Sequence, residues 1–95
     1  MAYEVDAFQP ADGIALEVEA GRGALGNAGY RDLIQASLMV DVDYLLLAVL
    51  IEYRFRVNGK PRVSKSYQDT RARLQAIYAS QRLVLPLRGV LLIGY

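Results

Sequence analysis

The chain is 95 residues long, which predicts one domain spanning residues 1–95. It contains no histidine and no cysteine, so the composition excludes Ser/His and Cys/His catalytic devices, Cys/His zinc sites, disulfides, and haem or iron–sulfur ligation. The net charge of +1 conceals a segregation, because residues 1–53 carry nine acids against two bases whereas residues 54–95 carry nine bases against one acid. Any bound metal must be held by oxygen ligands, and the 54% apolar content leaves apolar surface from which we expect a homodimer.

The sequence shows neither the pattern of a secretory signal nor that of a membrane span. The first ten residues lack a basic segment followed by an apolar core, and the longest apolar run, Tyr44–Ile51, is far shorter than the roughly 20 residues of a membrane-spanning helix. We therefore expect a cytoplasmic protein without a membrane partner.

The first 20 residues predict a β-hairpin. Residues 3–8 and 14–20 both alternate between polar and apolar side chains with a period of two. The segment between them contains Pro10 and Gly13, which are residue types typical of turns.

This hairpin gathers acidic side chains. A turn centred near residues 11 and 12 places Asp6 opposite Glu17 and Glu4 opposite Glu19, although a bulge in the turn would shift this pairing by one or two residues. Glu17 and Glu19 share one face of the second strand because they are two residues apart. Repelling carboxylates of this kind favour a divalent cation between them, so we predict Mg²⁺, or Mn²⁺, held by Asp6, Glu17 and the carbonyl of Val18, with Glu19 orienting or deprotonating a water.

The rest of the chain predicts two helices and two further strands. A glycine-rich link at residues 21–29, with Asn27 as a possible cap, precedes the first helix. The strand that follows is expected to be buried on both faces and parallel to the second hairpin strand, because a helix connects the two. The fold class is therefore α/β, a mixed sheet with flanking helices in the order ββαβαβ. The expected elements are a helix within 30–38, a strand at 42–55, a turn at 58–61, a helix from Ser64 or Ser66 to about Gln81, and a strand at 83–95.

At these acidic residues the sequence resembles the PD-(D/E)XK nucleases, and within them the catalytic cores of type II restriction endonucleases. The resemblance covers residues 5–52 and runs through Val5-Asp6, Gly13-Ile14-Ala15-Leu16-Glu17-Val18-Glu19, the helix Tyr30-Arg31-Asp32-Leu33-Ile34-Gln35 and the apolar strand from Tyr44. It implies a restriction-endonuclease-like fold and a metal bound by Asp6 and Glu17. Glu19 maps onto the third catalytic position, and Gln35, with Arg31 one turn earlier, onto the polar residue that the helix offers to the site.

Two features depart from the family's pattern. The third position usually holds Lys, and Glu19 occupies it here. The helix and strand that usually precede the first acidic strand are missing, since only five residues come before Asp6, and this leaves a sheet edge to be covered by a partner or by the C-terminal elements. The alternative function is therefore a catalytically inactive nuclease-like domain that acts as a DNA-binding or oligomerisation module.

Other interpretations of the first half stay open. The carboxylates could form the solvated face of an amphipathic hairpin, or serve an enzyme that acts on another phosphoester. Residues 21–26 have the G-x-G-x-x-G spacing of a dinucleotide-binding turn, but Glu17 and Glu19 would then be buried within a central strand, and the expected acid after the next strand is missing. The same glycines suit a flexible loop that lets a phosphate backbone approach.

The basic half of the chain carries the second functional signal. Its cations surround Tyr53 and Phe55 and continue into the second helix, and cations that neutralise phosphates supply most non-specific affinity for nucleic acids. The other interpretation is ordinary solvated side chains paired with the acidic half. With the carboxylates, these cations predict a metal-dependent DNA endonuclease. The residues expected to contact DNA are Arg22, Arg31, Arg54, Arg56, Lys60, Arg62, Lys65, Arg71 and Arg73.

Overall fold

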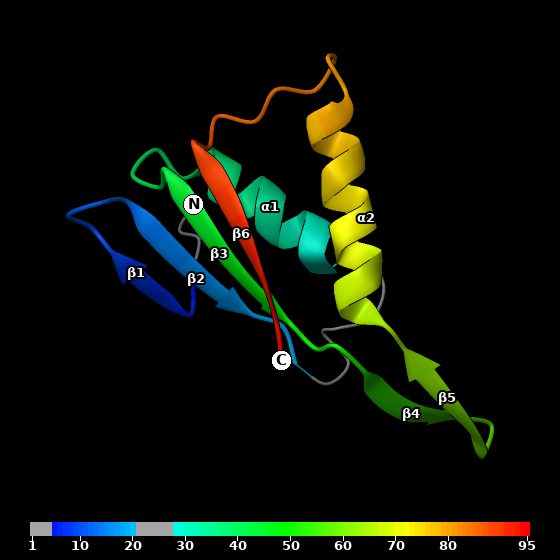
Figure 1. The fold of residues 1–95 in the computed structure, drawn as a ribbon. Helices are drawn as coiled ribbons and strands as arrows, with labels where there is room; N and C mark the ends of the chain where they lie inside the picture. The colour runs from blue at the N-terminus through cyan, green and yellow to red at the C-terminus, as the bar shows by residue number, and fades with distance from the viewer. Residues whose placement is uncertain (1–4, 21–27) are drawn as a thin grey trace.

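The computed structural model describes residues 5–20 and 28–95 (Figure 1). These residues form a four-stranded mixed sheet with the strand order β1-β2-β3-β6, a separate two-stranded sheet of β4 and β5, and two helices. In chain order the elements are β1 (Ala7–Gln9), β2 (Ile14–Val18), α1 (Ala28–Leu38), β3 (Tyr44–Val49), β4 (Tyr53–Val57), β5 (Lys60–Ser64), α2 (Ser66–Ala79) and β6 (Gly89–Gly94).

The predicted N-terminal hairpin is confirmed, including its register. β1 pairs antiparallel with β2, with Ala7 opposite Leu16, and the backbone N–H of Asp6, just before β1, donates to the carbonyl of Leu16 at 3.1 Å. Gly13, at the end of the turn, adopts a φ of 66°, and a Cβ there would lie 2.9 Å from the carbonyl oxygen of Asp41. A glycine is therefore needed at this position both for its backbone conformation and for the close approach of the chain before β3.

The parallel arrangement predicted for the strand after α1 is also confirmed. β3 pairs parallel with β2 on one side and with β6 on the other, and each connection passes through a helix. Such crossovers place helices over a sheet face, and both helices of this protein pack on the same face. The core there contains Ala15, Leu45 and Leu47, none of which is exposed to solvent, with Leu33 of α1.

The opposite face of the sheet is covered by neither helix in the described chain (Figure 1). Its side chains alternate with the core residues and are apolar, and several are strongly exposed, including Val18, Leu91 and Ile93. This open face is the apolar surface that the composition anticipates. The homodimer stays a prediction.

The single strand predicted over residues 42–55 is wrong. The chain leaves the main sheet after Val49 and begins a second hairpin, in which Tyr53 pairs with Ser64. The physical reason lies in the alternation of aromatic and arginine residues from Tyr53, a period of two that suits a two-sided exposed strand rather than one buried on both faces. The element order is consequently ββαβββαβ, and the order ββαβαβ describes it only when the second hairpin is set aside.

The remaining elements follow the sequence pattern with changed bounds: α1 begins two residues earlier than expected, whereas α2 and β6 are shorter. Both helices lie where they are expected, but the last strand begins at Gly89 rather than Leu83, and an irregular segment that contains Pro86 precedes it. Asn27 and the glycine motif at 21–26 lie outside the described residues. Among the helices of the described chain, none is long and apolar enough to cross a membrane.

Candidate metal centre

Three carboxylates converge under the sheet face that the helices cover. Glu17 and Glu19 lie on the same side of β2 as the buried Ala15, and Asp32 comes from the first half of α1, which packs against that side. One oxygen from each carboxylate lies within 4.8 Å of the other two. We refer to Glu17, Glu19 and Asp32 as the carboxylate triad.

The triad is removed from solvent. Asp32 is 4% exposed and Glu19 is 7% exposed, whereas Glu17 is half-buried. Within the part of the chain that the structure describes, the Oδ2 atom of Asp32 is buried and has no hydrogen-bond partner. A buried, unpaired carboxylate oxygen is costly, so the site requires either a proton or a cation next to Asp32.

Burial and the neighbouring acids raise the pKa values of the two glutamates in the triad. Burial, followed by the negative charges of Asp32 and Asp6, raises the pKa of Glu17 to about 7. Burial, with hydrogen bonding to Asp32 and repulsion from it, raises the pKa of Glu19 to about 8. Arg31 opposes both shifts. The metal-free site therefore holds protons close to neutral pH, which is the state expected of clustered acids that lack a counter-ion.

Hydrogen bonds fix the strand segment that carries two members of the triad, Glu17 and Glu19. Asp6 accepts a hydrogen bond on Oδ2 from the backbone N–H of Val18, at 2.6 Å. The backbone N–H of Glu19 donates to the carbonyl of Ala48 at 2.8 Å, and the hydroxyl of Tyr95 donates to the carbonyl of Glu19 at 2.6 Å. Glu19 is thus held from both β3 and the residue after β6, although it follows the last residue of β2.

The structure brings together the acidic residues predicted for the site, Asp6 and Glu17 as metal ligands and Glu19 as the residue that orients or deprotonates a water, and it adds one. Glu17 and Glu19 lie in the triad, and Asp6 lies beside Glu17, where its charge contributes to the raised pKa. The helix residue in the triad is Asp32 rather than the predicted Gln35, which is half-buried one turn later on α1. Sequence reasoning missed Asp32, yet a signal was present, because it lies four residues before the buried Ala36 and therefore on the core-facing stripe.

The predicted DNA-contacting cations separate into groups. Arg31 lies near the triad, and Arg73 of α2 lies over the ring of Tyr30, with its guanidinium carbon 5.4 Å from the ring centroid. Arg71 is exposed on α2, and Arg22 lies outside the described residues. The largest group belongs to the second hairpin and the residue after it: Arg54, Arg56, Lys60, Arg62 and Lys65.

The donor set fits a hard divalent cation. Carboxylate oxygens are the ligands preferred by Mg²⁺, Mn²⁺ and Ca²⁺, and ligand oxygens on opposite sides of such an ion lie about 4–5 Å apart. The separations of up to 4.8 Å in the triad are at the upper end of this range, so Mg²⁺, the smallest of the three ions, requires the side chains to move slightly inward. No protein-family model, no curated protein and no solved structure matches this chain.

Proposed function

We propose that the protein is a metal-dependent DNA endonuclease that hydrolyses phosphodiester bonds at the carboxylate triad. The observation that carries the proposal is the buried, unpaired Oδ2 atom of Asp32, within 4.8 Å of oxygens from two further carboxylates. The resemblance to the PD-(D/E)XK nucleases supports it, because Asp6, Glu17 and Glu19 match that family's three motif positions and lie near the carboxyl end of β2.

In this proposal Glu17 and Asp32 hold Mg²⁺ or Mn²⁺, and Glu19 lies beside them as the base. A bound divalent ion would polarise the phosphodiester and lower the pKa of a nearby water. Asp6 keeps the strand in place through its hydrogen bond to Val18, so it acts as a positioning residue.

The hydrolysis itself requires a base for the attacking water and a proton for the leaving oxygen. The oxygen of a water attacks phosphorus, one P–O ester bond breaks, Glu19 accepts the proton that the water loses, and the leaving oxygen takes a proton from solvent. Arg31 is exposed and lies close enough to lower the pKa of both glutamates. We expect its guanidinium to bind the phosphate that enters the site.

The test combines metal titration with plasmid cleavage. The wild type should bind Mn²⁺ in calorimetry and nick supercoiled plasmid when Mg²⁺ or Mn²⁺ is present. Glu17→Gln and Asp32→Asn should each lower the cleavage rate at least about 100-fold, because each removes a charged ligand. The matched control is Asp41→Asn, which removes an exposed acid outside the triad and should cleave as the wild type does. Cleavage that survives both triad variants would contradict the assignment.

The second candidate function is a catalytically inactive nuclease-like domain that binds DNA. The observation in its favour is Glu19 at the position where the resembled family usually carries Lys. A protein that binds DNA but takes up no Mn²⁺ in the titration would establish this alternative and remove the enzymatic one.

A further inference from the structure

The second hairpin is a separate arm of the molecule. β4 and β5 pair only with each other among the described strands, and in Figure 1 they extend away from the main sheet and the helices. The turn at the tip consists of Asn58 and Gly59, with φ angles of 51° and 75°. These values match a tight two-residue turn whose twist suits a regular two-stranded ribbon.

The arm is strongly and uniformly basic. Residues 53–65 contain five cations and no acid, and we refer to this segment as the basic hairpin. Among the described residues, Arg54 of the hairpin forms an ion pair with Glu52 at 3.6 Å, and the two side chains are 81% and 49% exposed. An exposed pair of this kind neutralises little charge. The hairpin therefore presents a concentrated positive charge to solvent.

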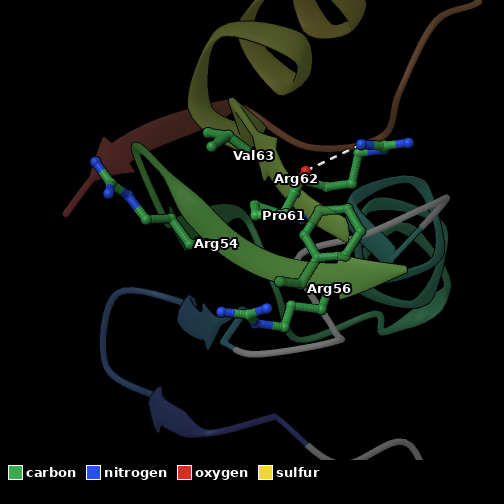
Figure 2. Close-up of a pocket in the computed structure, with 6 residues that line it drawn as sticks. Arg54, Arg56, Pro61, Arg62 and Val63 are labelled. Carbon is green, nitrogen blue, oxygen red and sulfur yellow. Dashed lines mark hydrogen bonds between the residues drawn. The ribbon is translucent and has the colours of Figure 1, made fainter. Parts of the chain in front are cut away.

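The cations lie on both faces of the ribbon. The register places Arg54 and Arg56 on one face, opposite Val63 and Pro61, whereas Arg62 shares the other face with Phe55. Lys60 precedes Arg62 by two positions and so lies on the same face as Arg62. In Figure 2 the guanidinium groups of Arg54, Arg56 and Arg62 point in different directions around a hollow of ≈ 300 Å³.

The arginines are partly held in place by the hairpin itself. The Nη1 atom of Arg62 donates to the carbonyl of Pro61 at 3.0 Å, and that of Arg56 donates to the carbonyl of Gly59 at 3.3 Å. A guanidinium has five N–H donors, so each of these bonds leaves most of the group available for a ligand. Both side chains thus lose less conformational freedom when they bind an anion.

A ribbon with cations on both faces has a specific geometric match. The major groove of B-DNA is about 12 Å wide and admits a two-stranded β-ribbon, and a phosphate backbone borders it on each side. Strands of five residues, about 17 Å long and about 5 Å apart, fit that width with their side chains. A hairpin with cations on one face only would instead lie flat on a single backbone.

We propose that the basic hairpin inserts into the major groove of duplex DNA, with Arg54 and Arg56 toward one phosphate backbone and Lys60 and Arg62 toward the other. The choice of DNA as the polyanion rests on the proposed function, and the ribbon geometry adds that the substrate is double-stranded. A single strand is less well matched, because the aromatic rings of the arm, Tyr53 and Phe55, stack on each other with centroids 5.6 Å apart and leave fewer free faces for bases.

The experiment measures binding of the whole chain to a short fluorescent duplex and to one of its single strands, in EDTA and over a salt series. The wild type should bind the duplex at least about 10-fold more tightly than the single strand. Arg54→Gln/Arg56→Gln should weaken duplex binding about 10-fold and reduce the slope of log Kd against log salt by about 2, since two phosphate contacts are lost. Arg82→Gln/Arg88→Gln removes the same charge from exposed sites outside the hairpin and should change Kd less than about 3-fold.

Dimethyl sulfate identifies the groove, because it methylates guanine N7 in the major groove and adenine N3 in the minor groove. Protection of guanine N7 by the wild type, lost in the hairpin variant, supports the proposal. Protection of adenine N3 alone, equal affinity for the two DNA forms, or equal effects of the hairpin and control variants would overturn it. Circular dichroism confirms that each variant is folded, and Arg62→Gln repeats the test at the other face of the ribbon.

These outcomes are independent of catalysis. Glu17→Gln should retain full duplex binding in EDTA even if it abolishes cleavage. A protein that binds duplex through the hairpin but never cleaves would refute the endonuclease and leave the hairpin proposal intact. Cleavage that depends on the triad, together with binding that is indifferent to Arg54 and Arg56, would refute the hairpin proposal alone.

Discussion

The carboxylate triad and the basic hairpin concentrate charge of opposite sign in opposite environments. The triad places three acids under a helix-covered sheet face, and its least exposed member, Asp32, has one buried oxygen without a partner among the described residues. The basic hairpin places five cations on an exposed ribbon with both faces in water. Like charges in water repel weakly, whereas buried like charges shift each other's pKa values and demand a counter-ion. A small cation that binds the triad would therefore reduce the repulsion among its buried carboxylates. The cations of the hairpin are solvated and repel one another weakly, and the ligand that suits them is a large polyanion.

The largest expected effect is stabilisation of the triad by a divalent ion. An ion that binds the folded chain at 100 times its Kd stabilises it by about 3 kcal/mol, which for a chain of this size raises Tm by roughly 10–20 °C. Thermal unfolding of the wild type with Mn²⁺ or with EDTA measures the rise. Asp32→Asn should lose most of it, and Asp41→Asn should keep it. Equal Tm values with Mn²⁺ and with EDTA for the wild type would contradict a metal centre at the triad.

The next effect is a pH dependence in the metal-free protein. The pKa values of Glu17 and Glu19 are raised from 4.5 to about 7 and about 8, so between these limits the folded state binds more protons than the unfolded state. Stability is then greatest below pH 4.5 as far as these two groups are concerned, and it falls as the pH rises towards 8. Thermal unfolding in EDTA from pH 5 to 9 tests whether Tm falls as the pH rises.

Asp32→Asn should make this pH profile shallower, because burial, the largest cause of the raised pKa values, remains while the repulsion from Asp32 is removed. Adding Mn²⁺ to the wild type should flatten it as well. A Tm that does not fall between pH 5 and pH 8 in EDTA would show that the pKa values of the two glutamates lie near their ordinary value of 4.5.

Much of the fold, and two of the three members of the triad, could be predicted from sequence periodicity. The period of two in the first hairpin specifies the register of residues 7–9, and Asp6, just before them, lies close to Glu17 as expected. The triad itself needs tertiary information, because Asp32 joins it only when the core-facing stripe of α1 is known. The basic hairpin was missed because an apolar run continues from β3 to within one residue of Tyr53, and only the arginine alternation after it marks a new strand.

A smaller effect is expected from the bond that holds Glu19 at its backbone. Tyr95→Phe deletes the hydroxyl that donates to the carbonyl of Glu19 and keeps the ring. A hydrogen bond of this kind contributes about 1 kcal/mol, which chemical denaturation resolves. The variant should also bind Mn²⁺ less tightly by a few-fold, since Glu19 loses one of its two backbone anchors. Tyr53→Phe is the matched control, and it should change neither quantity.

The smallest effect should come from the basic hairpin. Arg54→Gln/Arg56→Gln removes two exposed arginines, of which one forms a weak exposed ion pair. Surface changes of this type alter stability by within about 0.5 kcal/mol, so the urea midpoint of the variant should match that of the wild type while its duplex affinity falls. Because the variant has less repulsion among its remaining cations, it can be slightly more stable than the wild type, and this gain in stability should shrink as salt is added. A destabilisation above 1 kcal/mol would mean that these arginines support the fold, and a loss of DNA binding could then no longer be assigned to the ribbon surface alone.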